Sequence, residues 1–335
     1  MKLKRLTALL LSVMLVLSLA ACGGGKDAKD DSADGDLSGK EIIIGNITPV
    51  TGAQAAYGLA ITNSIQLAID EINADGGILG ATVKLSTKDD QGTPAEAVSG
   101  FCVLEDLQGE CELIVFPSAL EKLSPLLSEG AAAIIGATLS SCTSAITSLA
   151  DDEGIVLVTP SSTADSITTT DDYVFRSCFK DSFQGEMVAA YAKDQGWTKA
   201  AVLYATGDTY SSGLHDSFVK AAEKYGIEIV CEQSSSDTGA VDFSSQLATI
   251  AASGADMLFA PYYYDAVGPK IIPQAREAGF KGAIMGCDGF DGTQDYTTGD
   301  LSAYENVYFT NHYSPEDSSE IVQSYVKNYT EKYGS

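Results

Sequence analysis

The chain has 335 residues and a formal net charge of −26, because 46 acidic side chains outnumber 20 lysines and arginines. Such a charge argues against nucleic acid as a partner, since phosphate binding requires a basic surface. With 45% hydrophobic residues the chain can bury real cores, which excludes global disorder. Its 7 cysteines are too few for a disulfide-based scaffold at this length.

The beginning of the chain has the pattern of a secretory leader. Basic residues precede an apolar stretch at residues 6–19, and small residues then lead to Cys22. We therefore expect a signal peptide over residues 1–21. Its Leu-Ala-Ala-Cys ending resembles the lipobox of bacterial lipoproteins, which implies that Cys22 is lipidated. The alternative is an ordinary signal peptide followed by an unrelated cysteine.

Residues 22–40 combine Gly, Ser and charged side chains without an apolar period, which predicts a flexible tether. After residue 22 no apolar run approaches the roughly 20 residues that a membrane-spanning helix needs. Acyl chains on Cys22 would then be the membrane attachment, by a lipid anchor only. These features predict an extracytoplasmic protein, lipid-anchored to the cell membrane.

From residue 41 onward, short apolar runs alternate with stretches of helical periodicity. We expect strands at residues 41–47, 81–89, 132–136, 154–159, 199–205, 227–231, 256–260, 283–286 and 307–310. We expect helices at residues 59–72, 141–151 and 318–333, and further helices centred near Met187, Phe218, Leu247 and Ile272. Strands separated by helices of this length predict an α/β fold with doubly wound parallel sheets. In such sheets ligands bind at the carboxyl ends of the strands, near helix N-termini.

The common motifs of catalysis are absent from the sequence. It contains no P-loop, no dinucleotide-binding glycine motif, no nucleophile elbow, no H-E-x-x-H and no C-x-x-C. We interpret His215 as a surface histidine and assign no partner to His312. The sequence therefore predicts no enzyme, no cofactor and no metal. An extracellular hydrolase is the competing hypothesis, and it would need a nucleophile paired with a base.

Four polar loops follow predicted strands, at residues 45–58, 136–143, 159–163 and 286–290. Hydroxyls and free backbone N–H groups at a helix start form an anion site, so Ser140, Ser141 and Thr163 would suit a carboxylate. Asp288 would suit an ammonium group. Opposite charges in facing loops select a zwitterion. The competing interpretation is that these Ser and Thr residues are ordinary helix caps and turn residues.

Several longer segments occur in a characteristic order beyond residue 40. They read GNITPVTGAQAAYG, AIDEINADGGILG, KLSTKDDQGTPAEAV, IIGATLSSCTSAI, DEGIVLVTPSSTA, GDTYSSGL, PQAREAGF and MGCDGF. Together they resemble the extracellular solute-binding lipoproteins of branched-chain amino acid ABC transporters, the leucine/isoleucine/valine-binding type of periplasmic binding protein type I. The resemblance implies two α/β lobes that close on a ligand by a hinge. Lobe 1 would span residues 41–178, lobe 2 residues 179–310, and residues 311–335 would begin the return to lobe 1.

The resemblance also implies which residues bind the charged groups of the ligand. Ser140 and Thr163 would hold the α-carboxylate, with help from backbone N–H groups around Ser161 and Ser162. Asp288 would bind the α-ammonium group, where the best-known amino acid binders often carry Glu.

Three tyrosines would line the pocket by the same resemblance. Tyr57 would do so from the first lobe, and Tyr210 and Tyr263 would close over the ligand from the second. Since Tyr263 has tyrosine neighbours on both sides, any of Tyr262, Tyr263 and Tyr264 could face the ligand.

The sequence departs from the family's pattern at two places. Residues 100–132 look little like the single helix expected there. They would contain either an extra strand at 112–116 and a helix at 119–127, or a local reading-frame error. The chain also ends where the family's closing segment would begin, so the C-terminal part of lobe 1 would be missing. We interpret this as a fragment, with a defective protein as the alternative.

The expected function is that of a lipid-anchored substrate-binding protein. It would capture a branched-chain or related amino acid and deliver it to the permease and ATPase of an ABC importer. Small polar amino acids and amides are further candidate ligands. The alternative is a sensory protein of the same fold, which binds an amino acid or amide without transport.

Overall fold

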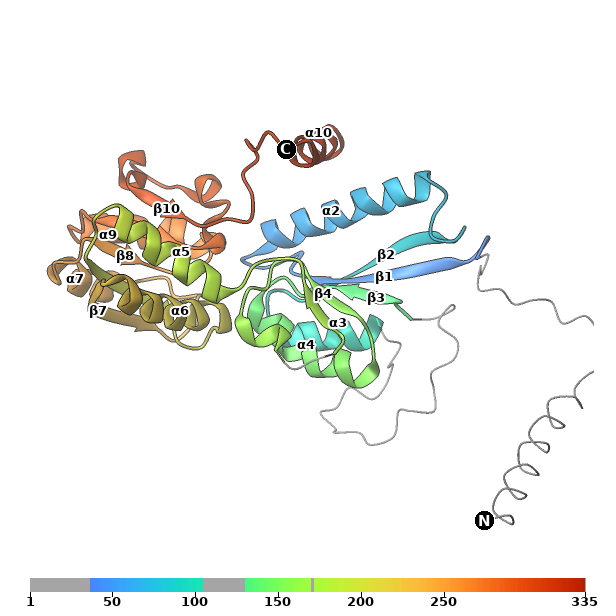
Figure 1. Ribbon diagram of the computed structural model, residues 1–335, viewed down its shortest axis with the longest axis horizontal. Helices are drawn as coiled ribbons and strands as arrows, with labels where there is room; N and C mark the ends of the chain where they lie inside the picture. Colours follow the sequence, from blue (N-terminus) through green and yellow to red (C-terminus); the bar gives the residue numbers. More distant parts are fainter. Residues whose placement is uncertain (1–36, 105–129, 170–171, 335) are drawn as a thin grey trace, which may run out of the picture. The chain divides into compact units, whose positions relative to one another are not determined.

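A computed structural model describes residues 37–104, 130–169 and 172–334 (Figure 1). The leader, Cys22, most of the tether and the elements expected at 112–116 and 119–127 lie outside these residues. Residues 38–335 form one compact unit. Of the helices within the described ranges, none is both long enough and apolar enough to cross a bilayer.

The first sheet contains five parallel strands in the order β2-β1-β3-β4-β5. Its strands are β1 (Glu41–Thr48), β2 (Thr82–Asp89), β3 (Ala133–Ile135), β4 (Leu157–Thr159) and β5 (Val174–Arg176). Its helices are α2 (Ala55–Ala74), α3 (Pro94–Leu104) and α4 (Ser140–Glu153). We call this sheet and its helices the first lobe. β5, a three-residue strand at the sheet edge, was not predicted from the sequence.

The second sheet also contains five parallel strands, in the order β10-β9-β8-β6-β7. Its strands are β6 (Lys199–Ala205), β7 (Glu228–Ser235), β8 (Met257–Phe259), β9 (Ala283–Gly286) and β10 (Val307–Phe309). Its main helices are α5 (Asp181–Asp194), α6 (Thr209–Tyr225), α7 (Ser244–Ala252), α8 (Tyr264–Ala266) and α9 (Ile272–Glu277). This is the second lobe. The prediction of two doubly wound parallel-sheet lobes is confirmed.

Alternation along β6 shows why the second sheet is covered on both faces. Successive side chains of a strand point to opposite faces. Ala200 and Val202 belong to a core cluster with α5 and α6, whereas Ala201 and Leu203 belong to a cluster with α7 and α9. Because β6 is apolar from Ala200 to Ala205, it requires a helical layer on each side.

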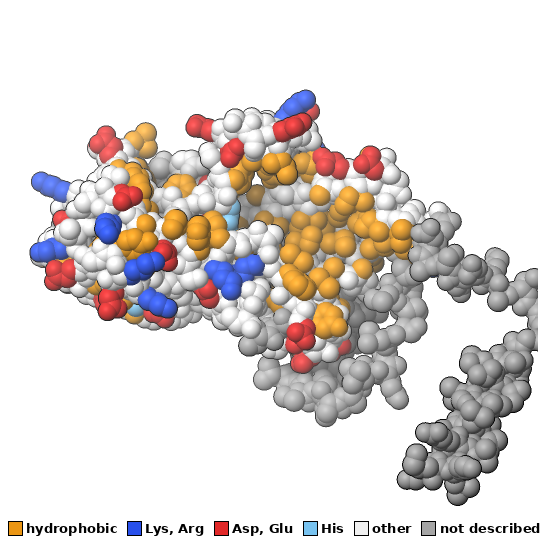
Figure 2. All heavy atoms as spheres, viewed as in Figure 1, with side chains coloured by type: hydrophobic (Ala, Val, Ile, Leu, Met, Phe, Trp, Pro, Cys, Tyr) orange, Lys and Arg blue, Asp and Glu red, His pale blue; other side chains and the backbone are white. Residues whose placement is uncertain are grey.

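The first sheet is likewise sandwiched, with α2 on one face and α3 and α4 on the other (Figure 1). Ile65 and Ile69, four residues apart on α2, pack on Val83 of β2. On the opposite face Ile47 and Ile134 join the larger core cluster. Figure 2 shows hydrophobic side chains gathered on the surface of the first lobe beside α2.

The chain passes between the lobes at residues 177–180, after β5, and again at residues 310–319, after β10. The second passage leads into α10 (Glu320–Tyr333), which confirms the helix predicted there. Tyr325 Oη lies 2.8 Å from Ser64 Oγ, and Asn63 Nδ2 donates to Tyr329 Oη at 3.2 Å. These contacts hold α10 against α2 of the first lobe.

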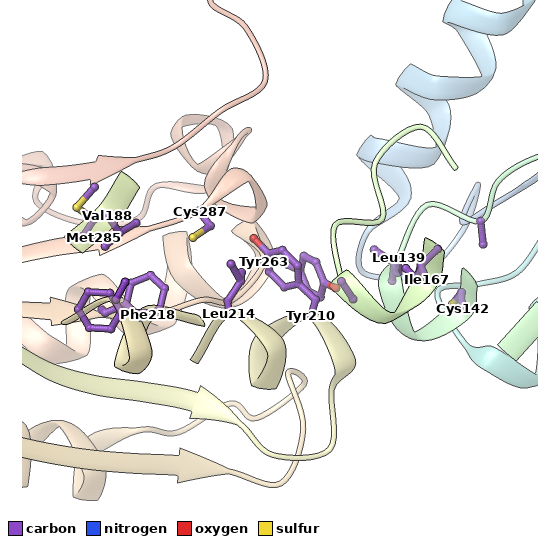
Figure 3. Packing of buried hydrophobic residues seen from close by; sticks show 14 of the residues in the cluster. Leu139, Cys142, Ile167, Val188, Tyr210, Leu214, Phe218, Tyr263, Met285 and Cys287 are labelled. Atoms are coloured by element: carbon purple, nitrogen blue, oxygen red, sulfur yellow. The ribbon is translucent and has the colours of Figure 1, made fainter. Parts of the chain in front are cut away.

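One hydrophobic cluster extends from the second lobe into the first (Figure 3). Tyr210 and Tyr263 project from the second lobe toward Leu139 of the first (Figure 3). The strand ends of the two sheets thus face a shared space.

Candidate ligand-binding site

A cavity of about 170 Å³ lies where the strand ends of the two lobes meet. Its lining consists of aromatic, aliphatic and polar side chains from both lobes, namely Tyr57, Ala60, Ile61, Thr138, Leu139, Ser140, Ser161, Tyr210, Tyr263, Asp288, Gly289, Asp291, Asn311 and His312. Six of the eight residues expected to bind ligand are among them: Tyr57, Ser140, Ser161, Tyr210, Tyr263 and Asp288.

The first lobe contributes the start of α4 to the cavity wall. Ser140 is the first residue of this helix, whose leading backbone N–H groups have no partner within the helix. Ser161, in the loop after β4, donates from Oγ to the carbonyl oxygen of Thr138 at 2.7 Å. That bond ties the loop after β4 to the loop before α4. The resulting wall combines hydroxyls with a helix N-terminus, which is a chemistry suited to an anion.

Gly136 allows the loop before α4 to approach β1. A Cβ atom at this position would lie 2.4 Å from the carbonyl oxygen of Ile47, so a larger residue would push the loop away from the sheet. Thr138 Oγ1 lies 2.6 Å from Thr48 Oγ1, which fixes the loop further.

Ser162 and Thr163 are placed behind the cavity wall rather than in it. Ser162 Oγ donates to the carbonyl oxygen of Ala137 at 3.0 Å and lies 2.6 Å from Thr143 Oγ1. Thr163 is fully buried next to the carboxyl group of Asp181. Ser162 thus ties the loop after β4 to the loop before α4, and the carbonyl oxygen of Thr163 accepts from the backbone N–H of Asp181 at 2.9 Å.

In the second lobe two stacked tyrosines form the opposite wall. The rings of Tyr210 and Tyr263 are 4.9 Å apart at 17°. Of the three consecutive tyrosines, only Tyr263 lines the cavity. Tyr262 packs in the second-lobe core against Phe243, and Tyr264 contacts the first lobe.

Asp288, which follows β9, is held by neutral donors from two helices. Its Oδ1 accepts hydrogen bonds from Gln184 Nε2 at 2.8 Å and from Tyr210 Oη at 2.9 Å. Its backbone N–H donates to Gln184 Oε1 at 3.1 Å. The backbone N–H of Gly289 donates to Tyr210 Oη at 2.7 Å. The carboxylate is therefore fixed in position, and no lysine or arginine of the described ranges forms an ion pair with it.

His312 is also at this carboxylate, contrary to the expectation that it has no partner. Its Nε2 lies 3.3 Å from Asp288 Oδ2, and its ring stacks on Phe179 at 4.0 Å. His312 and Gln184 were not predicted from the sequence. Gln184 lies inside a helix, and His312 follows β10 without a motif around it that indicates a ligand site. Both lie far from Asp288 along the chain, so only the folded topology brings them together.

Tyr57 reaches from α2 across to the second lobe. Its hydroxyl donates to the carbonyl oxygens of Gly289 at 2.7 Å and Asp291 at 3.1 Å. Burial and the nearby Asp288 raise the pKa of Tyr57 well above its ordinary value, and the same two causes act on Tyr210. Both hydroxyls therefore keep their protons and act as hydrogen-bond donors.

Two further contacts join the lobes beside the cavity. Gln54 Nε2 donates to Asp265 Oδ1 at 2.9 Å. Tyr264 Oη donates to the carbonyl oxygen of Ala53 at 3.0 Å and accepts from the backbone N–H of Ala56 at 3.3 Å. The lobes are thus in contact around the cavity.

His215, interpreted above as a surface histidine, is largely buried, with 13% of its side chain exposed. Its ring stacks on Tyr204 at 3.9 Å, and its nitrogens lie 2.8 Å from Asp216 and 2.9 Å from Glu232. It lies outside the cavity lining. Among the residues that the structure describes, no group of acids, histidines and cysteines is placed to hold a metal ion.

Comparison with known proteins identifies relatives along most of the chain. The sequence pattern of the periplasmic binding protein family matches residues 41–104 and 117–335. The Leu/Ile/Val-binding protein homolog 3 of Brucella melitensis is 29% identical over 273 residues, which cover 81% of this chain and 67% of that protein.

Solved structures show the same fold. The leucine binding protein LivK from Thermotoga maritima aligns with a TM-score of 0.75 and 28% identity, covering 88% of this chain and 77% of that one. The branched-chain amino acid transporter substrate binding protein LivJ from Streptococcus pneumoniae, solved in complex with isoleucine, aligns with a TM-score of 0.73 and 29% identity, covering 88% and 78%.

These matches confirm the resemblance described from the sequence and assign a substrate-binding role rather than an enzymatic one. The family is extracytoplasmic. With the two parallel-sheet lobes, the cavity between their strand ends and the match over most of its length, the chain belongs to the periplasmic binding protein family.

Proposed function

We propose that this protein captures a branched-chain or related amino acid outside the cell and delivers it to an ABC importer. The observation that carries the proposal is the pairing of opposite chemistries across one small cavity. The N-terminus of α4 with Ser140 forms one wall, and the carboxylate of Asp288 forms another. An anion site facing a carboxylate selects a zwitterion over a ligand with a single charge.

The proposed roles follow from this arrangement. The ligand carboxylate binds at the start of α4, with Ser140, Ser161 and the loop that contains Ser162 and Thr163. The ligand ammonium group binds Asp288. A helix N-terminus contributes about 0.3–1 kcal/mol to anion binding, and up to about 2 kcal/mol in a partly buried site.

The remaining lining suits an aliphatic side chain. Ile61 and Leu139 contribute aliphatic surface, and Tyr57, Tyr210 and Tyr263 contribute rings. An apolar cavity of about 150 Å³ takes up benzene, so the cavity of about 170 Å³ suits a compact ligand. Drug-sized ligands occupy pockets of about 300–1,000 Å³. The relatives named above, which bind leucine or isoleucine, support this choice.

The proposal includes a lipid anchor at Cys22, after a signal peptide at residues 1–21 and before a tether ending at residue 40. It also includes lobe boundaries at 41–178 and 179–310, with the return crossing at 311–335. Incorporation of labelled palmitate by the expressing cells tests the anchor. Label should be present in the protein and absent from Cys22→Ala.

Titration of the protein against all standard amino acids by calorimetry tests the ligand. We expect saturable binding of at least one of leucine, isoleucine and valine, with weaker binding of acidic and basic amino acids. Absence of saturable binding to any amino acid or amide would contradict the proposal. Uptake of labelled leucine by cells with and without the gene tests delivery separately from binding.

A further inference from the structure

The two carboxylate oxygens of Asp288 differ in how they are occupied. Oδ1 already accepts from Gln184 and from Tyr210, both at less than 3 Å. Oδ2 has a looser neighbour, His312 Nε2 at 3.3 Å. A ligand ammonium group that binds Asp288 therefore has to approach Oδ2, where His312 also lies.

Both passages of the chain between the lobes hold His312 at the cavity. It lies in the second passage, and its ring stacks at 21° on Phe179 of the first. About a third of its side chain is exposed, and it belongs to the cavity lining. The imidazole is thus oriented beside Asp288 and open to the ligand.

Resting on the proposed function, we propose that His312 is a further ligand contact that shares the ligand ammonium group with Asp288. When His312 is neutral, an unprotonated Nε2 accepts a hydrogen bond from the ammonium while Oδ2 accepts another. When His312 is protonated, it donates to Oδ2 itself and places a positive charge where the ammonium would bind. Proton and ligand therefore compete for the same carboxylate.

The other titratable and charged groups around Asp288 belong to α2, α5, α6, β5, the segment before α8, the loop after β9 and the first passage. They are Tyr57, Asp181, Tyr210, Tyr263, Arg176, Cys178, Cys287 and, one turn further on, Asp291. Burial raises the pKa of the three phenols and of both thiols, that of Cys178 to about 11, so these groups stay neutral near neutral pH.

Asp181 is a group in this set that changes its charge near neutral pH. Burial raises the pKa of Asp181 to about 8. Its protonation as pH falls also removes negative charge near the ligand ammonium. The effect of His312 must therefore be measured as the difference between the wild-type protein and a His312 variant, because Asp181 acts equally in both.

The sign of the expected effect follows from the competition. When His312 carries a proton, that proton must leave before the ammonium can bind. One competing proton weakens the apparent affinity by up to about tenfold per pH unit. A free amino acid keeps both its charges between about pH 5.5 and about pH 7.5, so the ligand itself adds no such dependence.

Calorimetric titration with L-leucine, L-isoleucine and L-valine at about pH 7.5 and about pH 5.5 tests the inference. We expect the wild-type dissociation constant to rise by about threefold to tenfold at the lower pH. His312→Gln, which keeps a hydrogen-bonding side chain but cannot titrate, should lose most of that rise. His215→Gln, at the other histidine and outside the cavity, is the matched control and should keep it.

The outcomes separate this inference from the proposed function. Equal pH dependence in the wild-type protein and His312→Gln, with binding intact, would overturn the role of His312 alone. A lack of binding of all three amino acids at both pH values would contradict the proposed function and the inference with it.

Discussion

At the scale of single residues, Asp288 is the group on which ligand binding should depend most. Asp288→Asn keeps the shape of the side chain but removes its charge. We expect a loss of ligand affinity of about 2–5 kcal/mol, since a charged ligand group would be left without its partner. Calorimetry measures this loss.

Asp300→Asn is a suitable control for that change, because Asp300 lies on the surface and caps a short helix through Ser302. Its affinity should equal that of the wild-type protein. An unchanged affinity in Asp288→Asn would show that another group binds the ammonium.

The residues of the site differ in how far the sequence could predict them. Ser161 and Asp288 come directly after strands, and Ser140 begins the helix that follows β3. Parallel sheets place ligands at such positions, so strand assignment and family resemblance together were enough. Gln184 lies inside α5, and His312 lies between β10 and α10. Gln184 reaches Asp288 through the packing of α5 within the second lobe, and His312 reaches it through the course of the second passage, which no local sequence pattern specifies.

At the scale of elements, the entry into α2 depends on a close approach at Gly58. A Cβ atom there would lie 1.9 Å from the carbonyl oxygen of Pro49 and 2.9 Å from Thr48 Oγ1. Gly58→Ala should gain up to about 1 kcal/mol of helix propensity, yet overpacking against backbone costs about 1–3 kcal/mol and occasionally more. We therefore expect a net loss of stability, measured by denaturant unfolding.

Ala68→Ser is a control for Gly58→Ala, because it adds one atom at an exposed position of the same helix. Its free energy of unfolding should stay within about 0.5 kcal/mol of the wild-type value. A Gly58→Ala protein as stable as the control would show that the loop before α2 moves freely away from the helix.

Most elements were predictable because apolar runs and helical periods mark them. β6 and β9 begin and end where the sequence pattern indicated, at Lys199–Ala205 and Ala283–Gly286. β5, with the residues Val174–Arg176, was not predicted, because only two of its three residues are apolar and the third is charged. Its place is set by pairing with β4 rather than by its own sequence.

At the scale of the whole molecule, buried carboxyl groups tie stability to pH. Burial raises the pKa of Asp181 to about 8 and that of Asp90 to about 6, above the ordinary value of about 3.9. The folded protein therefore holds protons that the unfolded chain releases. This contribution is complete below about pH 4 and is lost as pH rises through the folded pKa values.

The free energy of unfolding of Asp181→Asn should consequently increase relative to that of the wild-type protein as pH rises from about 5 to about 8. The increase is at most about 1.4 kcal/mol per pH unit. Unfolding midpoints of both proteins across this range measure the difference. A constant difference across the range would show that Asp181 is already ionised in the folded protein.

Contact between the lobes should also contribute to ligand affinity. Tyr264 makes such a contact and lies outside the cavity lining. Its hydroxyl bonds Ala53 and Ala56 of the first lobe, and its ring packs edge-on against Tyr57 at 4.7 Å. Tyr264→Phe keeps the ring but removes the hydrogen bonds. If the lobes also separate, as the family resemblance implies, the fraction of closed protein falls and the apparent dissociation constant rises in proportion.

Loss of about 1–1.4 kcal/mol from these bonds corresponds to an affinity about fivefold to tenfold weaker, measurable by calorimetry. Tyr262→Phe is the matched control, because that hydroxyl lies 2.8 Å from Ser235 Oγ within the second lobe. Its affinity should be unchanged even where its stability falls. Equal affinities in the two variants would mean that the bonds of Tyr264 to the first lobe do not bias the lobes toward the ligand-binding arrangement.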